Sequence, residues 1–123
     1  MQSAELKKKS DLYQRVKNFA LRVVKLFGAL PNSVEAQVIG KQLLRSGTSV
    51  GAQFAEAKRA RSRAEFESKL QGALQELEES GYWMDLLIEA KIIIPEKLAL
   101  LIQEQNELTA ILITSINTSK NKF

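Results

Sequence analysis

Apolar residues recur every three or four positions along this chain, which is the spacing of one face of an α-helix. Four such stripes are separated by turn and capping residues, and no alternating strand pattern competes with them. They predict helices over residues 11–30, 33–60, 63–91 and 95–117, with flexible ends at 1–10 and 118–123.

Capping residues and prolines mark where these helices begin and end. Pro31 ends the first helix, because the residue before a proline is pushed out of the α region. The predicted starts are Asp11 for the first helix, Asn32 with Glu35 for the second, Ser62 with Glu65 for the third and Pro95 for the fourth. Four amphipathic helices joined by short loops predict an all-α fold, an antiparallel up-and-down four-helix bundle.

Small residues form a strip along the second helix, at Ala36, Gly40, Gly47, Gly51 and Ala55. Each interior glycine costs up to about 1 kcal/mol relative to alanine, so the strip predicts a close approach of two helix backbones. A phosphate-binding loop at the glycines is the alternative. No strand precedes them and no Gly-Lys-Ser/Thr pattern follows, so helix packing is favoured.

The length of 123 residues suits one domain, and the composition excludes much enzyme chemistry. The chain has no cysteine and no histidine, which removes disulfides, thiolate nucleophiles, imidazole bases and the commonest zinc ligands. Glu76, Glu78 and Glu79 are the densest carboxylate group, but di-iron bundles also need histidine, so a charged helix face is favoured over a metal site. The sequence predicts no cofactor and no catalytic residue.

Three hydroxyl residues in the second helix are candidate nucleophiles by type, namely Ser46, Thr48 and Ser49. Lysine would be their only obvious base. Hydroxyls among glycines on a helix more often bond back to the backbone or line an interface, and that interpretation is preferred.

The early lysines Lys7, Lys8 and Lys9 are not followed by an uninterrupted apolar segment, so no secretory signal is expected. No apolar run approaches the roughly 18 residues that a membrane-spanning helix needs. We expect a cytoplasmic protein with no membrane partner.

Charge is divided unevenly along the chain, although the net charge is only +4. Residues 1–63 hold 13 Lys and Arg against 4 Asp and Glu, whereas residues 64–123 hold 5 against 10. This asymmetry indicates either an anionic polymer on the basic part or a second subunit that matches basic to acidic surface. The candidate phosphate contacts are Arg15, Arg22, Lys25, Lys58, Arg59, Arg61 and Arg63. The alternative is that these residues only form a solvated helix face.

A second group of residues is predicted to lie at a contact between subunits. Arg45 shares one side of its helix with Ser49 and Glu56, and its fork-shaped guanidinium suits Glu76 or Glu79 on the third helix. Tyr82 and Trp83 lie among acidic residues, which favours packing over stacking on bases. The predicted interface set is Arg45, Gly47, Ser49, Gly51, Glu56, Glu76, Glu79 and Trp83.

Two motifs carry a family resemblance. They are Leu-Leu-Arg-Ser-Gly-Thr-Ser-Val-Gly-Ala at residues 43–52, continued by Ala55-Glu56-Ala57, and the set Glu76, Glu79, Tyr82-Trp83 and Leu86-Leu87. The chain resembles the four-helix-bundle proteins encoded in intervening sequences of bacterial 23S ribosomal RNA genes, from Leu30 to about Ile116.

The resemblance implies a bacterial homopentamer without known enzymatic activity. It also implies kinship with the accessory variability proteins of diversity-generating retroelements, which bind nucleic acid and a reverse transcriptase. The first hypothesis is therefore a non-catalytic oligomeric accessory protein that binds nucleic acid, with RNA favoured. The alternative is a protein-interaction scaffold that docks a partner such as a reverse transcriptase without touching nucleic acid.

Overall fold

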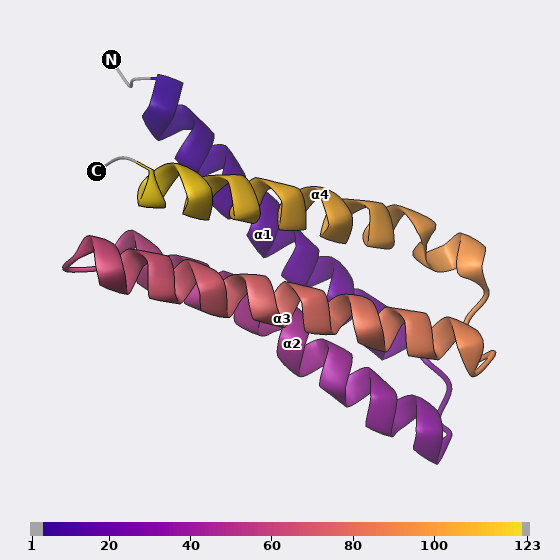
Figure 1. Ribbon diagram of the computed structural model, residues 1–123. Helices are drawn as coiled ribbons and strands as arrows, with labels where there is room; N and C mark the ends of the chain where they lie inside the picture. The colour runs from indigo at the N-terminus through magenta and orange to yellow at the C-terminus, as the bar shows by residue number, and fades with distance from the viewer. Residues whose placement is uncertain (1–3, 122–123) are drawn as a thin grey trace.

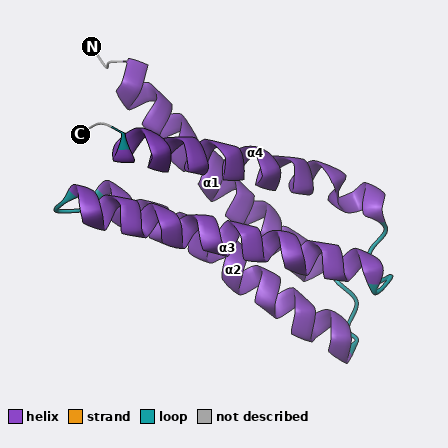
Figure 2. Cartoon of the chain, in the orientation of Figure 1, coloured by secondary structure: helices purple, strands orange, loops and turns teal. Residues whose placement is uncertain are grey.

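The computed structural model describes residues 4–121, with side chains from residue 11, and forms a four-helix bundle. The helices are α1 (Ala4–Ala29), α2 (Val34–Lys58), α3 (Arg63–Glu89) and α4 (Pro95–Lys120). Each runs back along the previous one, so the loops lie at the two ends of the bundle (Figures 1 and 2). The predicted fold is confirmed, and no strand occurs between residues 4 and 121.

The helix ends differ from prediction mainly at the chain termini. Helix α1 begins at Ala4, so Asp11 lies inside it instead of capping it. The early turns contain alanine, glutamate, leucine and three lysines, all strong helix formers, which explains why they need no cap at residue 11. Helix α4 likewise continues through 118–120. The rest of the predicted flexible ends, 1–3 and 122–123, lies outside the described residues.

Serine side chains cap the two helices of the central hairpin. The Ser62 hydroxyl accepts the backbone N–H of Glu65 at 3.0 Å, as predicted. At α2 the cap is Ser33, which accepts the N–H of Ala36 at 3.3 Å, and the prediction of Asn32 was one residue early. A serine and an asparagine cap equally well, so their adjacency left the sequence ambiguous.

The core comes from the predicted apolar stripes. Val16, Phe19 and Val23 of α1 are fully buried, and the stripes of the other helices meet them along the bundle axis. Gln105 is a polar exception on α4, and its amide donates to the backbone oxygen of Leu77 at 3.2 Å. The polar side chain that interrupts the α4 stripe therefore has a hydrogen-bond partner inside the core.

Helices α1 and α2 approach closely where the small-residue strip lies. A Cβ added at Gly47 would stand 2.9 Å from a methyl group of Val23, closer than real Cβ contacts. Gly47 is buried by α1 of its own chain, so its predicted place in a subunit interface is corrected to intrachain packing. Gly51 also faces α1, with 3.6 Å between an added Cβ and Val16. The predicted close approach is thereby confirmed.

Candidate functional site

The seven basic residues predicted to contact phosphate do not form one patch. Four of them gather at the α2–α3 hairpin, two lie on the exposed surface of α1 and one joins α1 to α4 through ion pairs. The hairpin group is Lys58, Arg59, Arg61 and Arg63, the two exposed residues of α1 are Arg22 and Lys25, and the residue that joins α1 to α4 is Arg15.

Arg15 joins α1 to α4. One of its guanidinium nitrogens lies 2.6 Å from Glu104 and 3.1 Å from Glu107, and its Nε donates to Glu104 at 3.1 Å. The Glu104 side chain is only 18% exposed, and its hydrogen bond to Arg15 is the main reason that the pKa of Arg15 is raised. Arg15 is therefore committed to holding two helices together and contributes little free charge to a phosphate.

The α2–α3 hairpin lies at one end of the bundle (Figure 1), and it carries four of the basic residues. Lys58 rests its ammonium 4.5 Å from the centre of the Tyr13 ring, which fixes the end of α2 against α1. Arg59 and Arg61 follow in the loop, and both are exposed. Arg63 opens α3 and lies 3.7 Å from Glu67.

Two carboxylates share the hairpin, but each has a partner of its own. Glu56 pairs with Lys69 at 2.8 Å and raises the pKa of that lysine, and Glu65 accepts the backbone N–H of Arg61 at 3.3 Å. Between residues 11 and 121 no carboxylate bonds to the guanidinium of Arg59 or Arg61. Arg59 and Arg61 line a shallow hollow of about 310 Å³ together with Glu56, Glu65 and Lys69.

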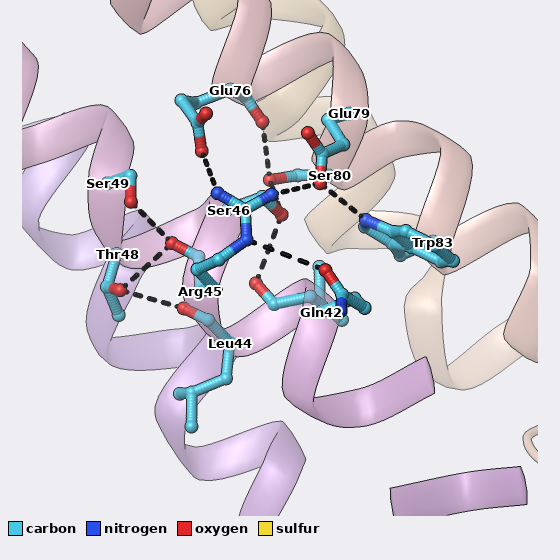
Figure 3. Close-up of polar contacts among 11 residues, drawn as sticks. Gln42, Leu44, Arg45, Ser46, Thr48, Ser49, Glu76, Glu79, Ser80 and Trp83 are labelled. Atoms are coloured by element: carbon cyan, nitrogen blue, oxygen red, sulfur yellow. Dashed lines mark hydrogen bonds and ion pairs between the residues drawn. The ribbon is translucent and has the colours of Figure 1, made fainter. Parts of the chain in front are cut away.

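The outer face of α2 and α3 holds a connected group of polar contacts (Figure 3). Arg45 donates to Glu76 at 3.0 Å and also to Glu79, and the indole N–H of Trp83 donates to Glu79 at 2.9 Å. The pairing predicted for Arg45 is confirmed, and it forms within one chain. Because Arg45 and Glu79 remain partly exposed, this face is still open to a second subunit.

The three candidate nucleophiles are all engaged in hydrogen bonds. Ser46 is fully buried, and its hydroxyl lies 2.9 Å from that of Ser80 on α3. Thr48 and Ser49 donate back to the carbonyls of Leu44 and Arg45 at 2.8 and 2.7 Å, as Figure 3 shows. The Ser46 hydroxyl also donates to the carbonyl of Leu43 at 3.3 Å, so the predicted return of these hydroxyls to the backbone is confirmed for all three residues.

Comparison with known families identifies the chain. The family model described as 23S rRNA-intervening sequence protein matches residues 8–114. The chain belongs to this family. A similar solved structure is that of a protein of unknown function from the S23 ribosomal protein family of Bacteroides thetaiotaomicron, with 40% identity and a TM-score of 0.85. The match covers 90% of this chain and 99% of that one, and no curated protein matched.

The acidic surface of this intervening-sequence protein extends farther along α3 than the charged helix face predicted at Glu76, Glu78 and Glu79. Glu78, Tyr82, Asp85 and Glu89 are all exposed and recur at helical spacing on the outer face of α3. Tyr82 is 58% exposed. The signal was present in the sequence, because residues 70–90 carry five carboxylates and no lysine or arginine.

Two other pairings of this family member were also missed. Tyr13 with Lys58 and Lys69 with Glu56 join residues from different helices, so no spacing within one helix predicts them. No helix in the described part of the chain has an apolar stretch fit to cross a membrane.

Glu79 is expected to make the stability of the protein depend on acid pH. The indole of Trp83, and after it Arg45, holds the pKa of Glu79 below its ordinary value. Its contribution is therefore present above the carboxyl pKa of the unfolded chain and is lost as the pH falls through the lower, folded pKa. Because Glu79 is partly exposed, we expect less than about 1 kcal/mol.

The measurement is the thermal midpoint of Glu79→Gln and of the parent between about pH 3 and pH 6. The parent should lose more stability than the variant as the pH falls. Glu78→Gln is the matched control, since this neighbouring carboxylate is exposed and has no partner between residues 11 and 121. Equal pH dependence in Glu79→Gln and the parent would contradict the assignment.

Proposed function

We propose that this chain is a non-catalytic accessory protein that works in the cytoplasm and binds nucleic acid, RNA in preference to DNA. The observation that carries the proposal is the α2–α3 hairpin, where Arg59 and Arg61 are exposed at one end of the bundle without carboxylate partners between residues 11 and 121. Arginine suits phosphate because its planar fork donates two parallel hydrogen bonds.

Further basic residues extend this surface. Lys58 is exposed beside the two arginines, and Arg22 and Lys25 are exposed farther along α1. No aspartate or glutamate lies between residues 12 and 34, so Arg22 and Lys25 have no acidic neighbour along α1 from residue 12 onward. The family description names an rRNA-intervening sequence, which makes structured RNA the first probe to use.

The proposal predicts strongly salt-dependent binding. Each phosphate contact releases counterions, so the logarithm of the association constant should fall linearly with the logarithm of the salt concentration. A filter-binding titration of structured RNA at several salt concentrations measures this slope. Weak binding that does not change with salt would contradict the proposal.

The acidic outer face of α3 favours a second candidate function. The exposed Tyr82 ring and the carboxylates Glu78, Asp85 and Glu89 suit a basic protein surface. On this alternative the protein is a scaffold that docks a partner such as a reverse transcriptase and makes no contact with nucleic acid. RNA binding that is absent even at low salt, together with capture of a basic partner, would select it.

We further propose that the protein assembles as a homopentamer. The basic surface of α1 and the acidic surface of α3 belong to different helices of one chain, and both carry exposed apolar residues such as Leu21 and Tyr82. Different surfaces that complement each other produce head-to-tail contacts, which form a ring when the rotation between neighbouring subunits closes. The residues of the α2–α3 face that stay accessible, among them Arg45, Ser49, Glu56, Glu76, Glu79 and Trp83, are the proposed flank of this contact.

Light scattering after size exclusion tests the assembly. A ring of five chains has five times the mass of the 13.8 kDa protomer. A uniform monomer near 13.8 kDa at micromolar concentration would contradict it.

A further inference from the structure

Ser62 lies at the centre of the basic hairpin, and its hydroxyl is accessible. The loop between α2 and α3 spans only residues 59–62, and Ser62 is exposed together with both of its neighbours. Its backbone is extended, with φ −149° and ψ 163°. An exposed serine in a surface loop is accessible to a modifying enzyme.

Arginines surround this hydroxyl on both sides. Arg59 lies three residues before Ser62, Arg61 immediately before it and Arg63 immediately after it. Neither Arg59 nor Arg61 is bound through its side chain to a carboxylate between residues 11 and 121. Enzymes that modify serine choose substrates in part by the charge pattern around the target, and this pattern suits an acidic substrate groove.

Ser33 provides an internal comparison. It also caps a helix, and its backbone is also extended, with φ −80° and ψ 158°. Its neighbours are Asn32 and Val34, and no lysine or arginine lies between residues 26 and 40. The positive surroundings, and not the capping position, therefore distinguish Ser62.

We propose that Ser62 is a phosphorylation site for a serine kinase with an acidic substrate groove, and that its modification switches off nucleic-acid binding at the hairpin. The Ser62 Oγ attacks the γ-phosphorus of ATP and forms the new O–P bond. The bond from that phosphorus to the β,γ-bridging oxygen breaks, ADP leaves with the electron pair, and the hydroxyl proton passes to the base of the kinase.

The bundle can carry this phosphate without losing its fold. Ser62 Oγ already accepts the N–H of Glu65, and phosphate oxygens are stronger acceptors at the same position. A negative group is also favourable at the first turn of α3, which is 27 residues long. The same phosphate adds about −1.5 to −2 charges beside Arg59 and Arg61. It therefore competes with RNA for those two arginines, an effect that rests on the proposed function.

The first experiment tests the modification on the full-length folded protein. A serine kinase that selects arginine three residues before its target is supplied with ATP, and the phosphorylated residue is located by mass spectrometry. We expect one phosphoryl group on Ser62, no product with Ser62→Ala and an unchanged yield with Ser33→Ala. Failure to modify Ser62, or equal modification of Ser33, would overturn the proposal whether or not the protein binds RNA.

The second experiment tests the switch. Ser62→Asp and Ser62→Asn cap α3 about equally and differ in one negative charge. At low salt we expect the aspartate variant to bind structured RNA about threefold more weakly than the asparagine variant, and phosphorylated protein about tenfold more weakly than unmodified protein. The thermal midpoints of the two variants should agree. The midpoint of the phosphorylated protein should equal or exceed that of the unmodified protein.

The outcomes separate the two proposals. If unmodified protein does not bind RNA at any salt concentration, the proposed function fails while the modification of Ser62 can still be observed. If unmodified protein binds RNA and phosphorylation changes neither its affinity nor its salt slope, the switch is wrong and the RNA-binding function stands. A phosphorylated protein that unfolds would overturn the claim that α3 accommodates the group.

Discussion

Gly47→Leu is expected to destabilise the bundle by about 3 kcal/mol and to lower its thermal midpoint by about 10 °C or more. Even the first added carbon would stand 2.9 Å from one methyl group of Val23 and 3.0 Å from the other. Valine is branched at Cβ and cannot rotate both methyl groups out of the way, so α1 must move off α2. Circular dichroism during thermal or urea unfolding measures the loss.

The same substitution at Gly28 is the matched control. This residue also lies in a helix, but an added Cβ there meets nothing within 4 Å. Leucine has a higher helix propensity than glycine, so Gly28→Leu should leave stability unchanged or raise it by up to about 1 kcal/mol. Equal losses at the two positions would show that backbone propensity, and not the contact with Val23, governs the effect.

Neutralising Arg59 and Arg61 together should weaken RNA binding by about tenfold to a hundredfold at low salt. Both side chains are exposed and have no carboxylate partner between residues 11 and 121, so Arg59→Gln with Arg61→Gln removes phosphate contacts without exposing a buried charge. The salt slope should also become shallower, by about 0.7 to 0.9 for each lost phosphate contact. Filter binding gives both quantities.

Lys91→Gln with Lys97→Gln is the control for net charge. These exposed lysines lie at the other end of the bundle, around the loop between α3 and α4 (Figure 1). The double change removes the same two positive charges from the protein. If it lowers affinity as much as the hairpin variant does, RNA binding depends on overall charge and the hairpin has no special role.

The site was less predictable than the fold, and Arg15 shows why. Its charge and its spacing from Arg22 made it a candidate phosphate contact, but it forms an ion pair with Glu104, 89 residues later in the chain. Arg59 and Arg61 carry the same charge and remain without such a partner between residues 11 and 121, because their loop projects at the end of the bundle. Whether a basic residue is free depends on carboxylates that the fold brings near, and no local pattern reports that.

The fold itself was readable because its causes are local. The recurrence of Val16, Phe19 and Val23 specifies one helical face, and Ser62 followed by Glu65 specifies a helix start, whatever the rest of the chain does. The start of α1 also has a local cause. The helix propensity of the lysine-rich turns before position 11 outweighs the capping preference of Asp11, so the helix begins at Ala4.

The sequence by itself determined four amphipathic helices, their order and the separation of basic from acidic halves, because periodicity, capping and charge are properties of neighbouring residues. Only the tertiary structure decided that Gly47 faces Val23 inside one chain, that Arg15 pairs with Glu104, and that Arg59 and Arg61 stay accessible. These outcomes depend on how helices rotate and pack against one another. The free energy of that arrangement is a sum over many weak contacts between residues far apart in the chain, and no single contact can be recognised from the local sequence.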